Sequence, residues 1–189
     1  KEILSGRLND EQMQRYSDAC AQLFDLGIYI EDSSSATAQQ LRSKCRIMKR
    51  KKVDIIFIDF LTLIKTKGRN KHEEVGKITK AAKAISKELD IPIVMLAQLS
   101  RKVEDRPNKR PQLSDLRESG SIEEDADCVM FLYRPEYYGI DANEYDHPVK
   151  GVAEVIIAKN KEGPTGMKRL LFDEPTMTFK NLDLQHKYQ

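Results

Sequence analysis

The stretch Val53-Asp54-Ile55-Ile56-Phe57-Ile58-Asp59-Phe60 is an apolar run that ends on an aspartate. Positions 55–58 are too apolar for a half-exposed strand, and unbroken β-branched runs of this kind are typical of strands buried on both faces. Such strands occur almost only in parallel sheets that helices cover. The stretch therefore predicts a parallel α/β sheet.

The last residue of this run, Asp59, would lie at the carboxyl end of the strand, where open α/β sheets bind their ligands. Two interpretations are open. The strand is a Walker B strand, in which Asp59 holds a nucleotide-bound Mg²⁺ directly or through water, or it is an ordinary core strand whose final aspartate begins a loop. The stretch alone does not separate them.

Composition sets broad limits on the class of protein. The 189 residues suffice for one sizeable domain, and a net charge of +2 says little about partners. Cys20, Cys45 and Cys128 lie far apart without a CxxC spacing, which argues against a zinc site and a disulfide framework and fits a cytoplasmic protein. No apolar run approaches the ~18 residues of a membrane span, and no signal peptide is visible.

The segments around the first strand predict further α/β units. Helical spacing of apolar residues predicts helices over 9–26, 36–51 and 72–89, and short apolar runs predict strands over 27–30 and 93–97. The second of these strands ends on Gln98. A strand, a helix and a second strand in this order form a right-handed parallel crossover by default.

Residues 100–121 keep no helical or strand period and are rich in basic residues: Arg101, Lys102, Arg106, Lys109, Arg110 and Arg117. We expect a long basic loop, and loops of this length are usually functional or disordered. A short acidic helix over 122–127 and a third buried strand over 128–133 follow. The tail predicts antiparallel strands over 153–159, 167–172 and 177–181, with a turn at 163–166.

Four segments together resemble the C-terminal motor domain of DnaB-type replicative DNA helicases. They are IIFIDFLTLI (55–64), LAQLSR (96–101), RPQLSDLRESGSIEEDAD (110–127) and IIAKNKEGPTG (156–166). The third is the most specific, and the resemblance covers nearly the full chain. It implies a RecA-like α/β fold in a single domain over 1–189, with a mostly parallel sheet flanked by helices and a C-terminal antiparallel hairpin.

The resemblance also implies a nucleotide site. Asp59 would position the Mg²⁺ of a bound ATP, which is the metal's usual role in phosphoryl transfer. Gln98, at the next strand end, would sense the γ-phosphate and report the nucleotide state to the loop that follows. The alternative for Gln98 is a strand-end amide that only satisfies a turn.

Arg117, Glu118 and Gly120 match the family's loop that contacts the backbone of single-stranded DNA. An arginine can pair with a phosphate, and a glycine lets the main chain approach one closely. Glu118 would act through a backbone N–H or by bracing Arg117. The alternative is a charged loop that is merely solvated.

Lys159 and Lys161 match a pair that reaches across a subunit interface to the neighbour's ATP. The family usually has arginine as the second member, whereas this chain has Lys161. Lysine is a point charge without the bidentate fork of a guanidinium, so this departure puts the finger role of Lys161 in question.

No Gly-x-x-x-x-Gly-Lys-[Ser/Thr] motif occurs in the chain, and the family's Ser-Leu-Glu-Met-type segment is absent as well. Both would lie upstream of Lys1. We therefore interpret the chain as the downstream part of a helicase motor domain, incomplete at its N-terminus. On its own it is expected to bind ATP poorly, to hydrolyse it hardly at all and to expose sheet edges.

The function predicted for the parent protein is ATP-driven translocation on single-stranded DNA and 5′→3′ duplex unwinding during DNA replication. The resemblance implies a homo-hexamer with a primase and a helicase loader as partners. Two alternatives remain: a RecA-like recombinase or clock-type ATPase, and a non-catalytic DNA-binding or assembly module that has lost its P-loop. Residues 117–127 favour the helicase.

Overall fold

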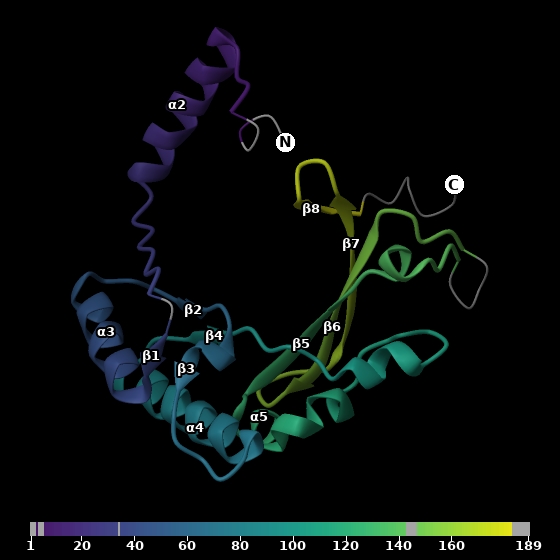
Figure 1. The fold of residues 1–189 in the computed structure, drawn as a ribbon. Helices are drawn as coiled ribbons and strands as arrows, with labels where there is room; N and C mark the ends of the chain where they lie inside the picture. Colours follow the sequence, from purple (N-terminus) through teal and green to yellow (C-terminus); the bar gives the residue numbers. More distant parts are fainter. Residues whose placement is uncertain (1–2, 4–5, 34, 143–146, 183–189) are drawn as a thin grey trace. The chain divides into compact units, whose positions relative to one another are not determined.

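The computed structural model describes residues 3, 6–33, 35–142 and 147–182, and it describes the backbone alone at Thr62 and residues 117–121. The chain divides into two compact units, Lys1–Ser34 and Ser35–Gln189 (Figure 1). The assignment of all 189 residues to one domain stays a prediction.

The first unit contains one long helix, α2 (Asp10–Phe24), which confirms the first predicted helix. Its start follows from a capping box, because Asn9 Oδ1 accepts from the Gln12 amide at 2.8 Å and Gln12 Oε1 accepts from the Asn9 amide at 3.0 Å. The strand predicted over 27–30 is wrong. These residues join no strand ladder in the described structure, and an extended run needs a neighbouring backbone to become a strand.

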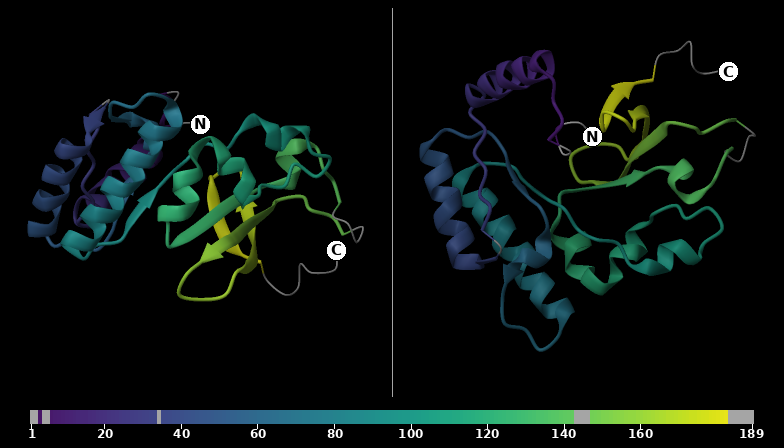
Figure 2. Two further views of the ribbon diagram at one scale, coloured as in Figure 1. Left: turned by 90° about the horizontal axis from the view of Figure 1, so that it is seen from below. Right: turned by 45° about the horizontal axis from the view of Figure 1, so that its top comes forward.

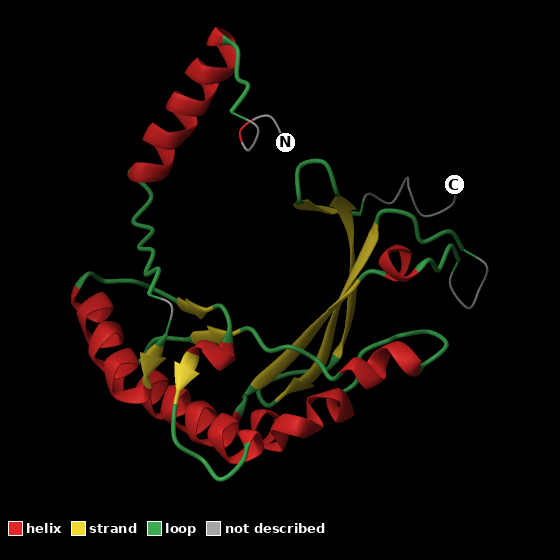
Figure 3. Ribbon diagram, in the orientation of Figure 1, coloured by secondary structure: helices red, strands yellow, loops and turns green. Residues whose placement is uncertain are grey.

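The second unit alternates strands and helices before it ends in an antiparallel sheet (Figure 3). Its helices and strands are β1 (Ala36–Thr37), α3 (Ala38–Arg50), β2 (Ile56–Ile58), β3 (Ile64–Lys65), α4 (Lys71–Leu89), β4 (Ile93–Met95), α5 (Gly120–Asp125), β5 (Cys128–Tyr133), β6 (Val152–Asn160), β7 (Gly166–Asp173) and β8 (Thr178–Asn181). Four short 3₁₀ helices are η1 (Leu61–Leu63), η2 (Arg101–Asp105), η3 (Leu113–Ser119) and η4 (Pro135–Tyr138). Within the described residues, no helix combines the length and the apolar character that crossing a membrane requires.

Two parallel strand pairs form the α/β part: β1 with β3, and β2 with β4. The chain passes from β2 through α4 to β4, which confirms the predicted crossover. Helices α3 and α4 lie side by side in all views (Figures 1 and 2), and Glu88 of α4 joins them. Its carboxylate lies 2.9 Å from Arg42 Nε and 2.6 Å from Arg46 Nη2.

Helix α4 supplies most of the core beneath the parallel strands. It buries Val75, Ile78, Ala82 and Ile85, the face that the 3.6-residue period predicts. Val75 and Ile78 belong to one cluster with Leu61 and Ile64, and Ile58 and Met95 pack against it. The strand ends that follow β2 and β4 are therefore held on a packed helix.

The prediction that β2 is buried on both faces is wrong, since Phe57 is 63% exposed. Successive side chains in a strand point to opposite faces. Ile58 packs on the α4 core, so Phe57 points away from it. Burial on both faces requires cover on both, and among the described strands β2 pairs with β4 alone.

The C-terminal part is one antiparallel sheet in the order β5-β6-β7-β8, which confirms the antiparallel tail and adds β5 to it. Strand β5 was predicted to be a buried strand, and this is wrong for one of its faces. Its side chains alternate: Phe131 is 5% exposed, and Leu132 is 67% exposed. The alternation is typical of an antiparallel sheet with one covered face.

The long loop predicted over 100–121 is also wrong as a description of the backbone. The segment contains η2 and η3 and leads into α5. A 3₁₀ helix has about three residues per turn and runs for only a few residues, so it leaves no 3.6-residue period to detect.

Candidate functional site

Asp59 and Gln98 lie at the carboxyl ends of neighbouring parallel strands. Strands β2 and β4 pair in register, with Ile58 opposite Met95. Two backbone bonds continue the pairing: the Leu96 amide donates to the Ile58 carbonyl at 3.0 Å, and the Leu61 amide donates to the Leu96 carbonyl at 2.9 Å. Asp59 lies in the sequence between Ile58 and Leu61, whose backbones make these two bonds, and Gln98 follows Leu96 by two residues. The structure thus brings both predicted nucleotide-site residues to one sheet edge.

Both side chains are available for a ligand. Asp59 and Gln98 are exposed, and within the described part of the chain neither side chain has a hydrogen bond or an ion pair. Mg²⁺ in nucleotide sites is usually held by one or two carboxylates, with phosphates and water completing the shell. A free carboxylate at this edge fits that donor set, and Gln98 adds a neutral donor and acceptor.

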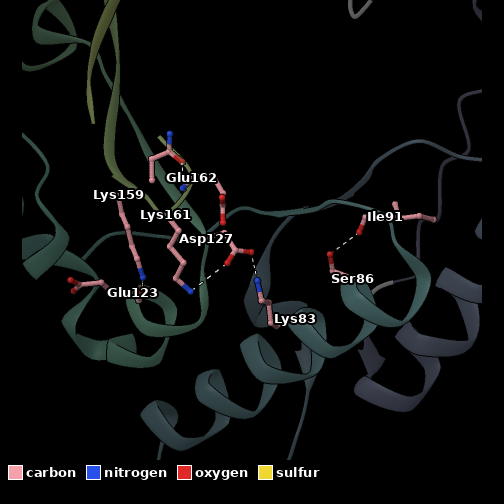
Figure 4. A network of polar contacts seen from close by, with 9 residues as sticks. Lys83, Ser86, Ile91, Glu123, Asp127, Lys159, Lys161 and Glu162 are labelled. Carbon is pink, nitrogen blue, oxygen red and sulfur yellow. Dashed lines mark hydrogen bonds and ion pairs between the residues drawn. The ribbon is translucent and has the colours of Figure 1, made fainter. Parts of the chain in front are cut away.

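Lys159 and Lys161 lie near α5 and the loop before β5 (Figure 4). Lys159 Nζ donates to the carbonyl oxygen of Glu123. The Lys161 amide donates to the Asp127 carbonyl at 2.9 Å, and Lys161 Nζ lies 3.4 Å from Asp127 Oδ1. Among the described residues, no hydrogen bond or ion pair joins either lysine to Asp59 or Gln98.

Asp127 is shared between two lysines. Lys83 of α4 pairs with Oδ2, and Lys161 pairs with Oδ1 (Figure 4). The hydrogen bond from Lys83, and then that from Lys161, hold the pKa of Asp127 below its ordinary value. Because Lys83 also pairs with Asp127, the Asp127 carboxylate keeps a partner when Lys161 moves away.

The predicted DNA-contacting residues lie at the junction of η3 and α5. Arg117 and Glu118 belong to η3, and Gly120 is the first residue of α5. Their side chains lie outside the described residues. Their roles stay predictions.

The segment before Arg117 is held by an ion pair between the half-buried Arg106 and the buried Asp115. Arg106 Nη2 lies 2.5 Å from Asp115 Oδ1, and Arg106 Nη1 donates to Oδ2 at 2.7 Å. The Gln112 amide also donates to Oδ2 at 2.7 Å. The guanidinium and this amide hold the pKa of Asp115 below its ordinary value.

A second pair fixes the same segment to the antiparallel sheet. Arg110 Nη1 lies 2.5 Å from Oε2 of Glu154, whose side chain is 5% exposed. The Arg110 guanidinium also lies over the Tyr133 ring, 5.4 Å from its centroid. The Tyr133 hydroxyl donates to the Asn108 carbonyl at 2.5 Å.

Three of the six basic residues from which we expected a basic loop therefore bind other groups of the same chain. Arg106 and Arg110 pair with buried carboxylates, and Lys109 Nζ donates to the Glu104 carbonyl at 2.7 Å. Arg101 and Lys102 remain exposed. The sequence offered one signal for this: Glu154 interrupts an apolar strand, and a buried carboxylate needs a partner.

The depressed pKa of Asp115 predicts a dependence of stability on pH. Unfolding returns the carboxyl to its ordinary value near 3.8. A carboxyl with a lowered folded-state pKa contributes stability above the unfolded value, and the contribution is lost as pH falls through the folded-state pKa. We expect the free energy of unfolding to fall below about pH 4. Asp115→Asn should lower the free energy of unfolding by about 3 kcal/mol at pH 7. In this variant the free energy of unfolding should also decrease less steeply as the pH falls below about 4.

Denaturant unfolding between about pH 2 and pH 7 measures both effects. Asp105→Asn serves as the matched control, since Asp105 is an exposed aspartate at the end of η2. An equally steep decrease below about pH 4 in Asp115→Asn and the unaltered protein would contradict the expected contribution of Asp115.

Comparison with known proteins identifies the family. The model of the DnaB-like helicase C-terminal domain matches residues 1–181. The replicative DNA helicase DnaB of Geobacillus stearothermophilus is 42% identical over 185 residues, and the replicative DNA helicase DnaC of Bacillus subtilis is 41% identical over 185 residues. Each alignment covers 96% of this chain and 40% of the relative, so the chain spans about two fifths of the length of these relatives.

Two solved structures share the fold. One of them, described as an ATPase domain, aligns with a TM-score of 0.86 and 36% identity, over 96% of this chain and 65% of that chain. A DnaB-like replicative helicase, whose structure was described with its interactions with primase, aligns with a TM-score of 0.82 and 37% identity, over 93% of this chain and 42% of that chain. The RecA-like α/β fold expected from the sequence is confirmed. The chain belongs to the family of DnaB-like helicase C-terminal domains.

Proposed function

We propose that this chain is part of the motor of an ATP-driven replicative helicase, which moves along single-stranded DNA and unwinds duplex DNA in the 5′→3′ direction. The observation that carries the proposal is the shared sheet edge of Asp59 and Gln98, with both side chains exposed. Membership of the DnaB-like family favours this function over that of a recombinase or clock-type ATPase.

In this proposal, the sheet edge takes the phosphates of ATP. Asp59 would hold Mg²⁺, and a metal ion there would supply positive charge to stabilise the negative charge of phosphoryl transfer. Gln98 hydrogen-bonds the γ-phosphate with its amide. The packed α4 core fixes the two strands at Ile58 and Met95, shortly before both residues.

In this proposal, residues at the junction of η3 and α5 contact the DNA. Arg117 pairs with a backbone phosphate, Gly120 allows close approach of the main chain, and Glu118 contributes a backbone N–H or braces Arg117. Backbone contacts carry no sequence information, which suits a motor that must accept every base. Two arginines, Arg106 and Arg110, pair with buried carboxylates in the segment that precedes this junction.

Lys159 and Lys161 act, in this proposal, on the ATP of a neighbouring subunit in a homo-hexamer. Lys161 is exposed, and an exposed side chain is accessible to a neighbouring subunit. A primase and a helicase loader are the proposed partners, and a primase interaction is described for one structural relative. The proposed site of action is the cytoplasm.

The DNA assignment is tested by replacing Arg117 with alanine in the full-length protein. One lost phosphate contact should weaken single-stranded DNA binding by about tenfold, since charge-assisted hydrogen bonds contribute about 1.5 kcal/mol or more. The slope of log K against log salt should become shallower by about 0.7. Fluorescence anisotropy over a salt series measures both quantities.

Arg50→Ala is the control, because it removes one exposed guanidinium from the last turn of α3. Its affinity and salt slope should equal those of the unaltered protein. An Arg117→Ala variant that also binds unchanged would remove the DNA role of this junction.

A further inference from the structure

Asp115 connects the segment that carries Gln98 with the segment that carries Arg117. Its backbone carbonyl accepts a hydrogen bond from the Ser100 amide at 3.1 Å. Ser100 follows Gln98 by two residues, and Asp115 precedes Arg117 by two residues. One backbone bond therefore links the two segments that the proposed function assigns to nucleotide and to DNA.

The side chain of Asp115 is fixed by hydrogen bonds of its own. Asp115 is only 4% exposed, and its carboxylate accepts three hydrogen bonds, two from the Arg106 guanidinium and one from the Gln112 amide. A planar guanidinium that binds both oxygens holds a carboxylate in one orientation. Asp115 cannot turn without breaking charge-assisted bonds inside the protein.

Helix η2 closes the connection into a ring. It begins after Ser100 and ends just before Arg106, and its Val103 is 5% exposed. The Val103 amide donates to the Ser100 carbonyl at 3.2 Å, and the Arg106 amide donates to the Val103 carbonyl at 3.4 Å. Ser100 thus reaches Asp115 twice, once directly and once through η2 and Arg106.

We infer that this ring, formed by Ser100, η2, Arg106 and Asp115, couples the nucleotide state sensed at Gln98 to the DNA contact at Arg117. The inference rests on the proposed function and names the residues that connect its two sites. A shift of the segment after Gln98 moves Ser100, and the closed, packed ring carries the shift to Asp115 and to η3. Arg106 and Asp115 are positioning residues and touch neither ligand.

Other cations of the segment do not take part in this ring. Arg110 pairs with Glu154 and anchors the segment to β6, whereas Arg101 and Lys102 are exposed. The ring is therefore specific to the Arg106–Asp115 pair, and the same substitution at an exposed neighbour provides a matched comparison.

The test uses two variants of the full-length protein that open the ring at different points. Arg106→Lys keeps the charge and loses the bidentate fork. Ser100→Pro removes the amide that donates to Asp115, and the φ of −61° at Ser100 suits proline. We expect each variant to reduce the stimulation of ATP hydrolysis by saturating single-stranded DNA at least about fivefold, the lower limit of usual allosteric coupling.

Basal ATP hydrolysis and the Kd for single-stranded DNA should change by less than about threefold in both variants, because a coupling free energy is separate from the affinity of either site. Arg101→Lys is the matched control and should keep full stimulation, since Arg101 is an exposed arginine at the start of η2. Circular dichroism melting confirms that each variant folds.

Stimulation within about twofold of the unaltered protein in either folded variant overturns the inference. Stimulation that returns when more DNA is added also overturns it, because the defect is then one of affinity. If one variant fails to fold, the other decides the question. Failure of the proposed function itself would be visible without any substitution, as ATP hydrolysis that single-stranded DNA does not change, and the inference would fall with it.

Discussion

Replacing Asp59 with asparagine in the full-length protein is expected to lower the rate of ATP hydrolysis by about a thousandfold. The amide removes the negative charge that would hold Mg²⁺ at the carboxyl end of β2, and metal stabilisation of developing phosphate charge is worth several kcal/mol, at about 1.4 kcal/mol for each factor of ten. The fold should tolerate the change, because Asp59 is exposed and its carboxylate has no hydrogen bond or ion pair within the described chain.

Asp54→Asn is the matched control for this variant. Asp54 is an exposed aspartate just before β2, on the amino side of the strand. Steady-state kinetics and circular dichroism melting on both variants separate a catalytic effect from an unfolded protein. Equal turnover by Asp59→Asn and Asp54→Asn would contradict the metal role of Asp59.

Replacing Lys161 with alanine is expected to lower ATP turnover by about a hundredfold, less than the thousandfold or greater effect of an arginine finger. A lysine offers one point charge to the phosphates and lacks the bidentate geometry of arginine. Lys161→Arg should therefore retain or raise the turnover. Asp127 keeps Lys83 as a partner in both variants, so neither leaves its charge unpaired.

Lys168→Ala controls for the loss of one exposed lysine from the antiparallel sheet, because Lys168 lies on β7 and is exposed. Its turnover should be unchanged. Full activity in Lys161→Ala would assign the contact with the neighbour's ATP to another residue, and Lys159 would be the next to replace.

The predictions that succeeded depend on short-range patterns. The apolar run before Asp59 and the 3.6-residue period of α4 are local properties of the chain, and both elements form as expected. Asp59 and Gln98 meet at one edge because parallel strands align their carboxyl ends, which follows from the crossover rule. The positions of Asp59 and Gln98 at neighbouring strand ends were therefore predictable from local patterns, and their role at a nucleotide stays a prediction.

The predictions that failed depend on what covers or pairs with a residue. Phe57 looks like a core residue in sequence, and its exposure reflects the neighbours of β2. Arg106 looks like a DNA-binding cation, and its pairing with Asp115 spans nine residues without any period. Asp127 contacts lysines from two distant segments. Such contacts are set by tertiary structure and leave no pattern in the neighbouring residues.

ATP hydrolysis by the full-length protein, measured with and without single-stranded DNA, tests the central claim most directly. The proposed motor predicts that single-stranded DNA raises the rate, that duplex DNA of the same length raises it less, and that a forked duplex is unwound in the 5′→3′ direction only while ATP is consumed. A protein that hydrolyses no ATP, or that hydrolyses it at one rate whatever DNA is present, would contradict the account.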